Sequence, residues 1–349
     1  MEYRTLGSTG VRVSTHCLGT MMLGDWGNRD HDEAVRVVHA ALDGGINFVD
    51  TADVYSSGES EEIVGAALKG RRDEVILATK FHGSMGPGEN DRGNSRAWIM
   101  RAVENSLRRL QTDHIDLYQA HRPDPDTDVE ETLSALTDLV RQGKIRYFGS
   151  STFPAWQLVQ AQWASERRGL ERLRCEQSPY SIMTRGIERD VLPVAQAYGM
   201  GVIVWSPLSR GWLTGKYRRD EEPDAASRAG RAKDRGEYVV RQFDRSRPEI
   251  QRKLDIVDAL RPVADKAGIS IGHMSIAFAL AHPAVTSAIV GPRTPEQVQD
   301  LLTGADVRLD GETLDAIDQI VPPGELVDEN DRGYLPPWME PAARRRGGG

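Results

Sequence analysis

The 349-residue sequence predicts a (β/α)8 barrel with an N-terminal β-hairpin and long loops after its strands. Eight short apolar runs alternate with amphipathic stretches along most of the chain, which is the pattern of a barrel or of a doubly wound open sheet. No GxGxxG follows the first run, and this counts against the open sheet. No break in composition divides the chain, so we expect one barrel domain over residues 1–321 and a tail, residues 322–349, that is disordered in part.

A short hairpin precedes the barrel in this prediction. Tyr3–Leu6 and Val11–Val13 flank the Gly-rich turn GSTG, an arrangement typical of two antiparallel strands. We then expect the barrel strands at His16–Gly19, Ile46–Asp50, Val75–Thr79, Ile115–Ala120, Ile145–Ser150, Arg174–Gln177, Gly201–Trp205 and Ser287–Val290.

Helical stretches separate these strands. In Val129–Arg141 the apolar residues recur three and four positions apart, which places them on one face of a helix. Asp32–Leu42 and Arg96–Leu110 have the same spacing.

Three connections are longer than packing alone requires. They are Thr20–Asp30, the Gly-rich His82–Asn94, and a stretch from Leu208 to about Arg247 that is dense in charged residues. Each follows a predicted strand, and in a barrel the loops after strands form the reactive end. Loops of this length in a compact domain are usually functional or disordered.

The composition excludes several classes of protein. A hydrophobic content of 39% with 28% charged residues is typical of a soluble globular chain, and no apolar run approaches the roughly 20 residues that span a bilayer. The net charge of −8 argues against a nucleic-acid partner. Cys17 and Cys175 lack the spacing of a metal site, so we expect buried reduced thiols and no metal. The N-terminus MEYRTLGSTG does not resemble a secretory signal, and we expect a cytoplasmic protein.

Four side chains with acid–base chemistry lie at or just after the ends of three predicted strands. Asp50 ends one strand and Tyr55 follows it, Lys80 ends the next, and His121 follows the third. The carboxyl ends of parallel strands meet at one end of a barrel, so the four groups are expected to share one site. A nearby lysine ammonium stabilises a phenolate, so Lys80 is expected to make Tyr55 a better acid, with Asp50 holding Lys80 and His121 orienting a carbonyl oxygen.

Each of these residues alone also has a structural interpretation. Asp50 could cap a loop, Lys80 could be solvated at a strand end, His121 could be a structural hydrogen-bond partner and Tyr55 could pack a loop. Their joint occurrence at one end favours a site that protonates a carbonyl oxygen while another group supplies hydride.

The strings GINFVDTADVYSSGESE, ATK around Lys80 and HRPDPDT resemble the aldo-keto reductase family, in particular bacterial members and members related to potassium-channel β-subunits. The resemblance extends from LGSTGVRVS to about Leu302. It implies a (β/α)8 barrel, a nicotinamide cofactor lying across the strand ends, and a catalytic tetrad of Asp50, Tyr55, Lys80 and His121 in which Tyr55 donates the proton.

The resemblance also implies a set of cofactor contacts. Ser150 and Ser151 of SST, together with Gln177, would hold the nicotinamide carboxamide, and Trp205 would stack on the nicotinamide ring. Thr152 stands where the family often has Asn, so Ser151 is the better candidate of the two serines. The full set is Gly19, Thr20, Met21, Asp50, Ser150, Ser151, Gln177, Trp205, Ser206, Pro207, Leu208, Arg210, Lys216, Arg228, Gly291, Arg293, Gln297 and Asp300.

An anion site is expected after the last strand. Thr294 can cap a helix with Pro295 in its first turn, leaving free N–H groups that attract a phosphate, and Arg293 adds a fork of donors. This favours NADPH over NADH. The family resemblance likewise implies Arg293 at the 2′-phosphate and Gln297 and Asp300 near the adenosine, although Leu301 stands where many relatives have Asn.

The leading interpretation is an NADPH-dependent reductase of a small-molecule aldehyde or ketone. One alternative narrows the substrate to a sugar nucleotide or a natural-product ketone, and another is a nucleotide-sensing regulatory subunit. We expect Trp26, Tyr55, Phe81 and His121 to line the substrate pocket, with Met21 and His82 beside them. The sequence leaves open whether the chain is a homo-oligomer, and whether the tail with Tyr334 and Trp338 covers the site, packs elsewhere or frays.

Overall fold

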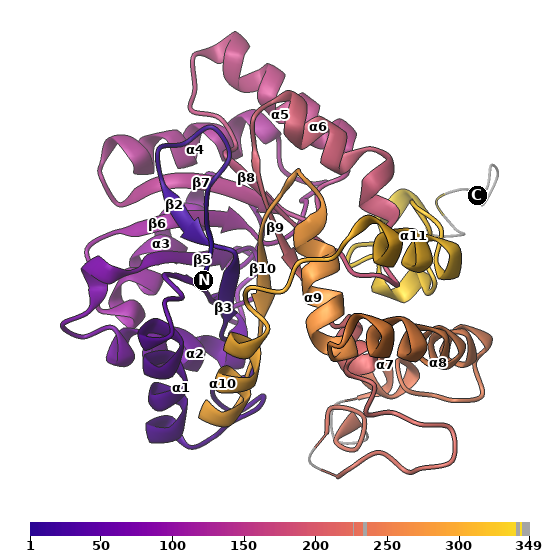
Figure 1. Cartoon of the computed structure of the whole chain (residues 1–349). Coiled ribbons are helices and arrows are strands. Elements are labelled where there is room, and N and C mark those ends of the chain that lie inside the picture. Colours follow the sequence, from indigo (N-terminus) through magenta and orange to yellow (C-terminus); the bar gives the residue numbers. More distant parts are fainter. Residues whose placement is uncertain (226, 233–235, 340–342, 344–349) are drawn as a thin grey trace.

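Eight parallel strands form a closed barrel in the computed structural model of the chain, which describes all residues except 226, 233–235, 340–342 and 344–349. The neighbour order is β10, β3, β4, β5, β6, β7, β8, β9, so each strand pairs with the next along the chain and β10 closes the ring against β3. The predicted (β/α)8 fold is therefore confirmed (Figure 1). The barrel strands are β3 His16–Gly19, β4 Phe48–Asp50, β5 Ile76–Phe81, β6 Ile115–Ala120, β7 Ile145–Ser151, β8 Cys175–Pro179, β9 Gly201–Trp205 and β10 Val285–Val290.

Helices surround the barrel. Those predicted at Arg96–Leu110 and Val129–Arg141 have these bounds in the structure, as α3 and α4, and their first turns are capped by the side chains of Ser95 and Asp128. The other helices are α1 His31–Asp43, α2 Glu59–Ala67, α5 Ala155–Arg168, α6 Val191–Ala197, α7 Glu237–Arg241, α8 Pro248–Ala267, α9 Ile271–Ala281, α10 Pro295–Thr303 and α11 Gly311–Ile320. The 20-residue α8 packs against α9 and α11, at the edge of the molecule in Figure 1.

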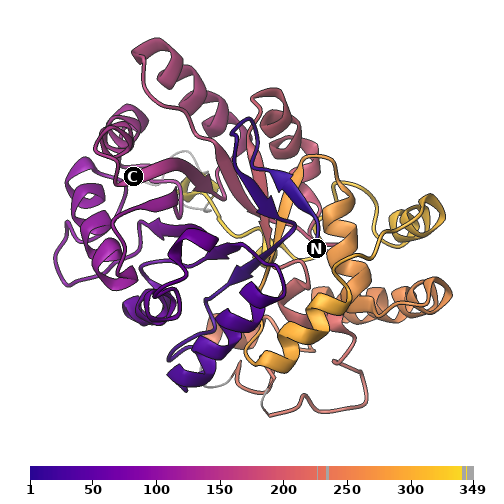
Figure 2. The same ribbon diagram turned by 60° about the vertical axis from the view of Figure 1, so that its left-hand side comes forward.

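The predicted hairpin is confirmed as β1 Tyr3–Thr5 paired with β2 Arg12–Ser14, and it closes the end of the barrel at which the strands begin (Figure 2). Leu6 and Val13 are fully buried among apolar side chains that point into the barrel. The turn passes so close to β9 that a Cβ on Gly7 would lie 2.3 Å from the nitrogen of Gly201, and Gly7 has φ +54°. Glycine is therefore required at this position.

The interior of the barrel has an apolar layer beneath a polar one. The apolar layer consists of Cys17, Phe48, Ala78, Leu117, Cys175 and Ile203, together with the two hairpin side chains. Because side chains on a strand alternate between its two faces, the residue two positions further along also points inward. On five strands these next residues are Asp50, Lys80, Gln119, Gln177 and Trp205. Both cysteines are buried free thiols, as expected.

The chain after α11 packs against the barrel rather than leaving it. Val327 donates its backbone N–H to the carbonyl of Met183, 3.1 Å away, and Leu326 forms an isolated bridge with Thr184. Further on, the ring of Trp338 lies 5.9 Å from that of Trp156 on α5. The RRRGGG terminus, which was predicted to be disordered, lies outside the described residues.

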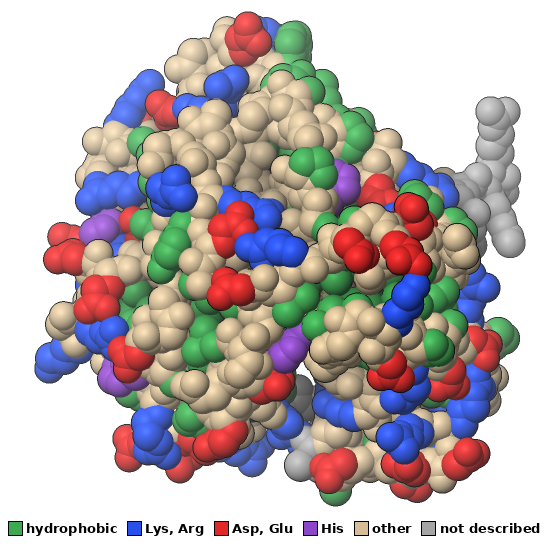
Figure 3. Space-filling view, in the orientation of Figure 1, with side chains coloured by type: hydrophobic (Ala, Val, Ile, Leu, Met, Phe, Trp, Pro, Cys, Tyr) green, Lys and Arg blue, Asp and Glu red, His purple; other side chains and the backbone are tan. Residues whose placement is uncertain are grey.

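The face seen in Figure 3 carries acidic and basic side chains intermixed. Among the residues that the structure describes, no helix combines the length and apolar character needed to cross a bilayer.

Candidate active site

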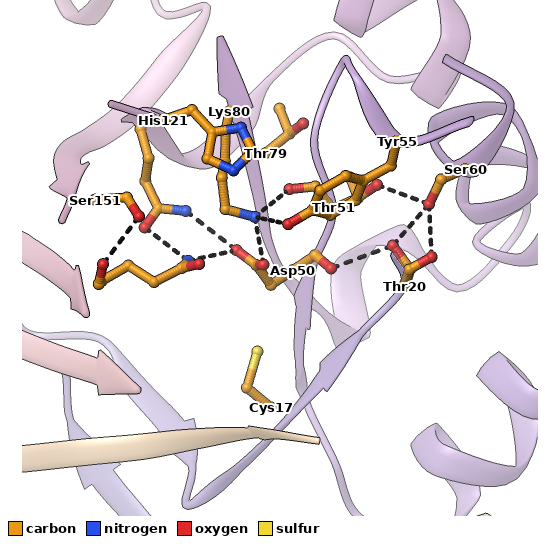
Figure 4. A network of polar contacts seen from close by, with 12 residues as sticks. Cys17, Thr20, Asp50, Thr51, Tyr55, Ser60, Thr79, Lys80, His121 and Ser151 are labelled. Carbon is orange, nitrogen blue, oxygen red and sulfur yellow. Dashed lines mark hydrogen bonds and ion pairs between the residues drawn. The ribbon is translucent and has the colours of Figure 1, made fainter. Parts of the chain in front are cut away.

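Asp50 and Lys80 form a buried ion pair at the centre of the polar layer. The two residues lie on adjacent strands, β4 and β5, and their side chains are 2% and 0% exposed. Lys80 Nζ lies 2.5 Å from Asp50 Oδ1, while Asp50 Oδ2 accepts hydrogen bonds from the amides of Gln119 at 3.1 Å and Gln177 at 2.9 Å (Figure 4). Both carboxylate oxygens are thus satisfied, as a buried charge requires.

Lys80 also fixes the direction of the Tyr55 hydroxyl. Its ammonium donates to Asp50, to the carbonyl of Thr51 at 2.7 Å and to Tyr55 Oη at 3.2 Å. An ammonium has three N–H donors and no acceptor, so Tyr55 Oη receives a hydrogen from Lys80 and must direct its own elsewhere. The hydrogen of the Tyr55 hydroxyl is therefore available to an acceptor other than Lys80, such as a molecule bound at the mouth of the barrel.

Two opposing effects act on the charge of Lys80. Burial alone would lower the pKa of the ammonium, but the Asp50 carboxylate and the Tyr55 hydroxyl outweigh burial and raise that pKa. These two partners therefore favour the charged form of Lys80 next to the phenol.

His121 follows β6 and lies beside Tyr55, with its ring 5.8 Å from the phenol ring in an edge-on arrangement. Burial, and then the nearby Lys80 cation, lower the pKa of His121 well below its ordinary value. The imidazole is therefore neutral at neutral pH, and it can offer one N–H to a bound oxygen.

The loop that carries Tyr55 is held by buried hydroxyl groups. Thr20 Oγ1 lies 2.9 Å from Ser60 Oγ, which lies 3.0 Å from Thr51 Oγ1, and Thr20 also donates to the carbonyl of Asp50 (Figure 4). Thr20 thus contacts the predicted site through the Asp50 backbone.

Sequence reasoning missed Gln119, which is fully buried and bonded to both Asp50 and Gln177. The alternation of β6 was a usable signal, since Gln119 lies two residues before His121 and two after the inward-facing Leu117. Gln177, predicted to bind a carboxamide, lies in this same network and directs its amide at Asp50.

Two residues of the predicted site, Phe81 and Ser150, direct their side chains away from the barrel interior. Strand β5 continues one residue past Lys80, and alternation turns Phe81 outward, where it is fully buried with its ring 4.8 Å from that of Tyr118. Phe81 thus packs in the apolar cluster that the strands share with the surrounding helices. Ser150 also faces outward, and its hydroxyl donates to the buried Glu176 at 2.5 Å, whereas Ser151 faces inward and donates to the carbonyl of Gln177.

Two other predicted pocket residues, Trp26 and His82, lie in loops that follow barrel strands. Trp26 is 37% exposed and its ring lies 6.0 Å from that of Tyr55. His82 is half-buried, and its Nδ1 lies 2.9 Å from Asn94 Oδ1, so its own loop holds it.

The residues predicted to contact a cofactor form an arc from β7 across β9 and β10 to β3. Trp205 ends β9 and is partly exposed, and Ser206, Pro207 and Leu208 lead into the 3₁₀ helix η4, Ser209–Thr214, which contains Arg210. A Cβ on Gly291, after β10, would lie 3.7 Å from the carbonyl of Gly19 on β3, and the half-buried Met21 follows β3 after Thr20.

A cluster of cations lies between η4 and α10. Burial, and then Arg293, lower the pKa of Lys216, while burial and then Arg231 lower the pKa of Arg293. Asp224 is the carboxylate that opposes both effects, and Arg228 lies in the same loop. Such mutual repulsion is relieved when an anion binds.

The start of α10 adds further donors to this cluster. Thr294 caps the helix and Pro295 occupies its first turn, as predicted. Gln297 accepts from the backbone N–H of Arg293 at 2.8 Å, and Asp300 is largely exposed. The N-terminus of α10 therefore faces the cation cluster with the polarity that suits a phosphate.

Strained backbone is concentrated at this end of the barrel. Apart from Gln111, which ends α3, the described non-glycine residues with positive φ follow barrel strands: Ser56, Ser57, His82, Thr152, Ser206, Ser209 and Arg210. Each such conformation costs on the order of 1–3 kcal/mol and is typical of functional sites.

Asp53 is a buried carboxyl next to the site. Its oxygens have no hydrogen-bond partner among the described residues, and its backbone N–H donates to the carbonyl of Lys80 at 3.1 Å. Burial, followed by the Glu61 carboxylate, raises the pKa of Asp53 to about 8. The unfolded value is about 3.9, so between these values the folded chain holds a proton that the unfolded chain has released, and the stability falls as the pH rises.

Asp53→Asn is expected to remove the part of the pH-dependent loss of stability that is due to Asp53. The variant should be more stable than the parent at pH 8, by on the order of a few kcal/mol, and should match it near pH 4. Urea unfolding across this pH range tests this, with the exposed Asp113→Asn as the control. Parallel pH profiles for the parent and Asp53→Asn would contradict it.

The fold and the site together define a (β/α)8 barrel protein with a buried Asp–Lys–Tyr network and a neutral histidine at the carboxyl ends of its strands. Residues 17–322 match the Aldo/keto reductase family. The chain belongs to this family.

The chain aligns with individual members of the family over nearly their whole lengths. The chain is 40% identical over 333 residues to an uncharacterized oxidoreductase, YrpG, of Bacillus subtilis, covering 92% of this chain and 96% of the relative. It is 36% identical to the aldo-keto reductase YhdN of the same organism, covering 91% and 92% of the two chains. It is also 33% identical to a probable voltage-gated potassium channel subunit beta of Arabidopsis thaliana, with 92% and 97% covered.

Proposed function

We propose that this protein is an NADPH-dependent oxidoreductase that reduces the carbonyl group of a small aldehyde or ketone. A nicotinamide dinucleotide, when bound, would supply the hydride for the carbonyl carbon. Tyr55 donates its proton to the carbonyl oxygen, Lys80 stabilises the phenolate that remains, and His121 orients the oxygen through an N–H.

The observation that carries the proposal is the three-way donation by Lys80. The ammonium is fully buried and its hydrogens go to Asp50, Thr51 and Tyr55. This leaves the phenolic hydrogen of Tyr55 for a substrate and puts a fixed positive charge beside the phenolate that proton transfer creates.

The residues at the strand ends suit an anionic dinucleotide. Trp205 offers a ring for stacking, and the inward-facing Ser151 and Gln177 lie near it on adjacent strands. Arg210 lies on η4, directly beyond Trp205, where the pyrophosphate would lie. Lys216, Arg293 and the N-terminus of α10 would receive the additional phosphate that distinguishes NADPH from NADH, with Arg228 nearby.

The direct test is the decrease of nicotinamide absorbance when the purified protein is mixed with NADPH and a reactive aromatic aldehyde or a quinone. Consumption of NADPH that depends on both the protein and the carbonyl compound supports the proposal. Tight binding of NADPH without turnover on any carbonyl would overturn it and would favour the regulatory alternative.

Arg293→Gln is expected to weaken NADPH binding about ten- to hundredfold while leaving NADH binding nearly unchanged, because a charge-assisted contact to the phosphate is lost. Titration calorimetry with each nucleotide measures the two dissociation constants. Arg146→Gln is the matched control, because it makes the same change in charge near the start of β7, at the opposite end of the barrel. Equal losses for the two nucleotides would place Arg293 away from the additional phosphate.

A nucleotide-sensing regulatory subunit is the second candidate, and the potassium channel subunit beta of Arabidopsis thaliana among the relatives favours it. The complete Asp50, Tyr55, Lys80 and His121 set weighs toward an enzyme. A sugar nucleotide or a natural-product ketone is a narrower choice of substrate within the proposed activity. The free buried thiols of Cys17 and Cys175 suit a reducing compartment such as the cytoplasm.

A further inference from the structure

The segment after α11 crosses the carboxyl end of the barrel and brings two buried carboxylates to it. Asp328 and Asp331 are 1% and 5% exposed; Asp328 caps the 3₁₀ helix η6, Glu329–Asp331, and Asp331 is its last residue. The backbone N–H of Arg185 donates to the carbonyl of Glu325 at 2.7 Å, which joins the segment to the loop after β8. The segment is thus part of the folded barrel end.

Asp331 joins the segment to two cations. Its Oδ2 lies 2.5 Å from Nζ of Lys253, a fully buried residue of α8, and its Oδ1 accepts from Arg210 Nε at 3.0 Å. The Arg210 and Asp331 side chains are 11% and 6% exposed. Water therefore screens this pair weakly, and the guanidinium is held in one place.

Asp328 forms an ion pair with Lys253, as Asp331 does, but its second cation is Arg247 rather than Arg210. Its oxygens lie 3.4 Å from Lys253 Nζ and 3.2 Å from Arg247 Nη2. Burial opposes its ionisation, but the backbone N–H of Asn330 and the Lys253 cation prevail and lower the pKa of Asp328 to about 2. Lys253 thus forms ion pairs with both carboxylates. Asp331 forms ion pairs with both Lys253 and Arg210.

Two residues past Asp331 the chain lies against the indole of Trp205. Gly333 has φ +87°, and a Cβ there would lie 2.7 Å from Cζ2 of Trp205 and 3.0 Å from Cγ2 of Thr152. Only glycine permits this approach. The same short segment therefore contacts both the aromatic ring proposed to stack on the nicotinamide and the arginine proposed to meet the pyrophosphate.

We propose that Asp331 is a positioning residue of the cofactor site, which bridges Lys253 to Arg210 and so fixes the guanidinium where the pyrophosphate binds. The inference rests on the proposed function, because it requires a bound dinucleotide. Holding a long side chain in its binding conformation before the ligand arrives removes an entropic cost from binding. Because the charge of Asp331 is shared with Lys253, Arg210 keeps positive potential for the phosphates.

Asp331→Asn is expected to raise the dissociation constant for NADPH about tenfold, as measured by titration calorimetry. Asp328→Asn is the matched control, since it also removes a buried carboxylate beside Lys253 but leaves the contact with Arg210 in place. Both variants should melt at lower temperature than the parent, and the control should change NADPH binding by less than about twofold. Equal losses of affinity in the two variants would reduce Asp331 to a structural role and overturn the proposal.

A double-variant cycle tests whether Asp331 affects NADPH affinity through Arg210 or independently of it. If Asp331 works through Arg210, then Asp331→Asn adds no further loss of NADPH affinity in an Arg210→Gln background. Independent, additive losses would overturn the proposal while leaving the reductase function intact. Failure of the parent protein to bind either NADPH or NADH would instead overturn the proposed function, and this inference with it.

Discussion

Replacement of Tyr55 by Phe is expected to lower the rate of carbonyl reduction by about 10²- to 10⁴-fold, the usual contribution of a general acid. The ring and its contacts with Trp26 and His121 remain in the variant, and only the hydroxyl that Lys80 orients is lost. Steady-state turnover with a saturating aldehyde measures the rate, and calorimetry with NADPH should give an unchanged dissociation constant.

Tyr3→Phe is the control for this experiment. Its hydroxyl donates to the carbonyl of Gly45 at 2.7 Å, next to the hairpin at the closed end of the barrel, so the change is chemically identical but distant from the site. The control should retain full activity. Undiminished activity in Tyr55→Phe would mean that another group protonates the substrate.

Lys80→Met is expected to destabilise the fold by about 3–5 kcal/mol, because it leaves Asp50 as a buried charge without its counter-ion. Gln119 and Gln177 would still donate to that carboxylate, but neither amide carries a positive charge. Denaturant unfolding monitored by circular dichroism measures the loss. The double variant Asp50→Asn/Lys80→Met should recover most of the stability, because it buries no charge.

Lys144→Met provides the comparison for this prediction. Lys144 pairs with Glu104 near the surface, with the two side chains 32% and 49% exposed, and exposed pairs contribute about 0–1 kcal/mol. A loss from Lys80→Met no larger than that from Lys144→Met would contradict the prediction that the buried ion pair stabilises the fold.

Strand period and chain order sufficed to predict the barrel and the meeting of Asp50, Tyr55, Lys80 and His121 at one end of it. Asp50, Lys80 and His121 lie at or directly after strand ends, and the carboxyl ends of parallel strands meet at one end of a barrel. Gln119 was equally predictable from alternation, but attention to strand ends alone missed it.

Which face of a strand a side chain occupies was harder to predict than where the strand ends. Phe81 and Ser150 lie at the predicted strand ends, yet each is one residue out of phase with an inward neighbour, Lys80 or Ser151, and so points toward the helices. A shift of one residue reverses the face of every side chain.

The role of the terminal segment could not be predicted from local pattern. Asp331 meets Arg210 and Lys253 across 121 and 78 residues of chain, and no periodicity links such distant positions. Gly333 likewise has no local signal for its contact with Trp205. Contacts of this kind depend on the assembled fold.

The β1–β2 hairpin closes one end of the barrel, so that only the other end is open. Because Leu6 and Val13 lie among the apolar side chains at the end where the strands begin, the polar layer is reached through the end at which the strands finish. In the proposed reaction the dinucleotide and the carbonyl compound would both enter through this end. We therefore expect an obligatory order, in which the partner that lies deeper against the strand ends arrives first and departs last.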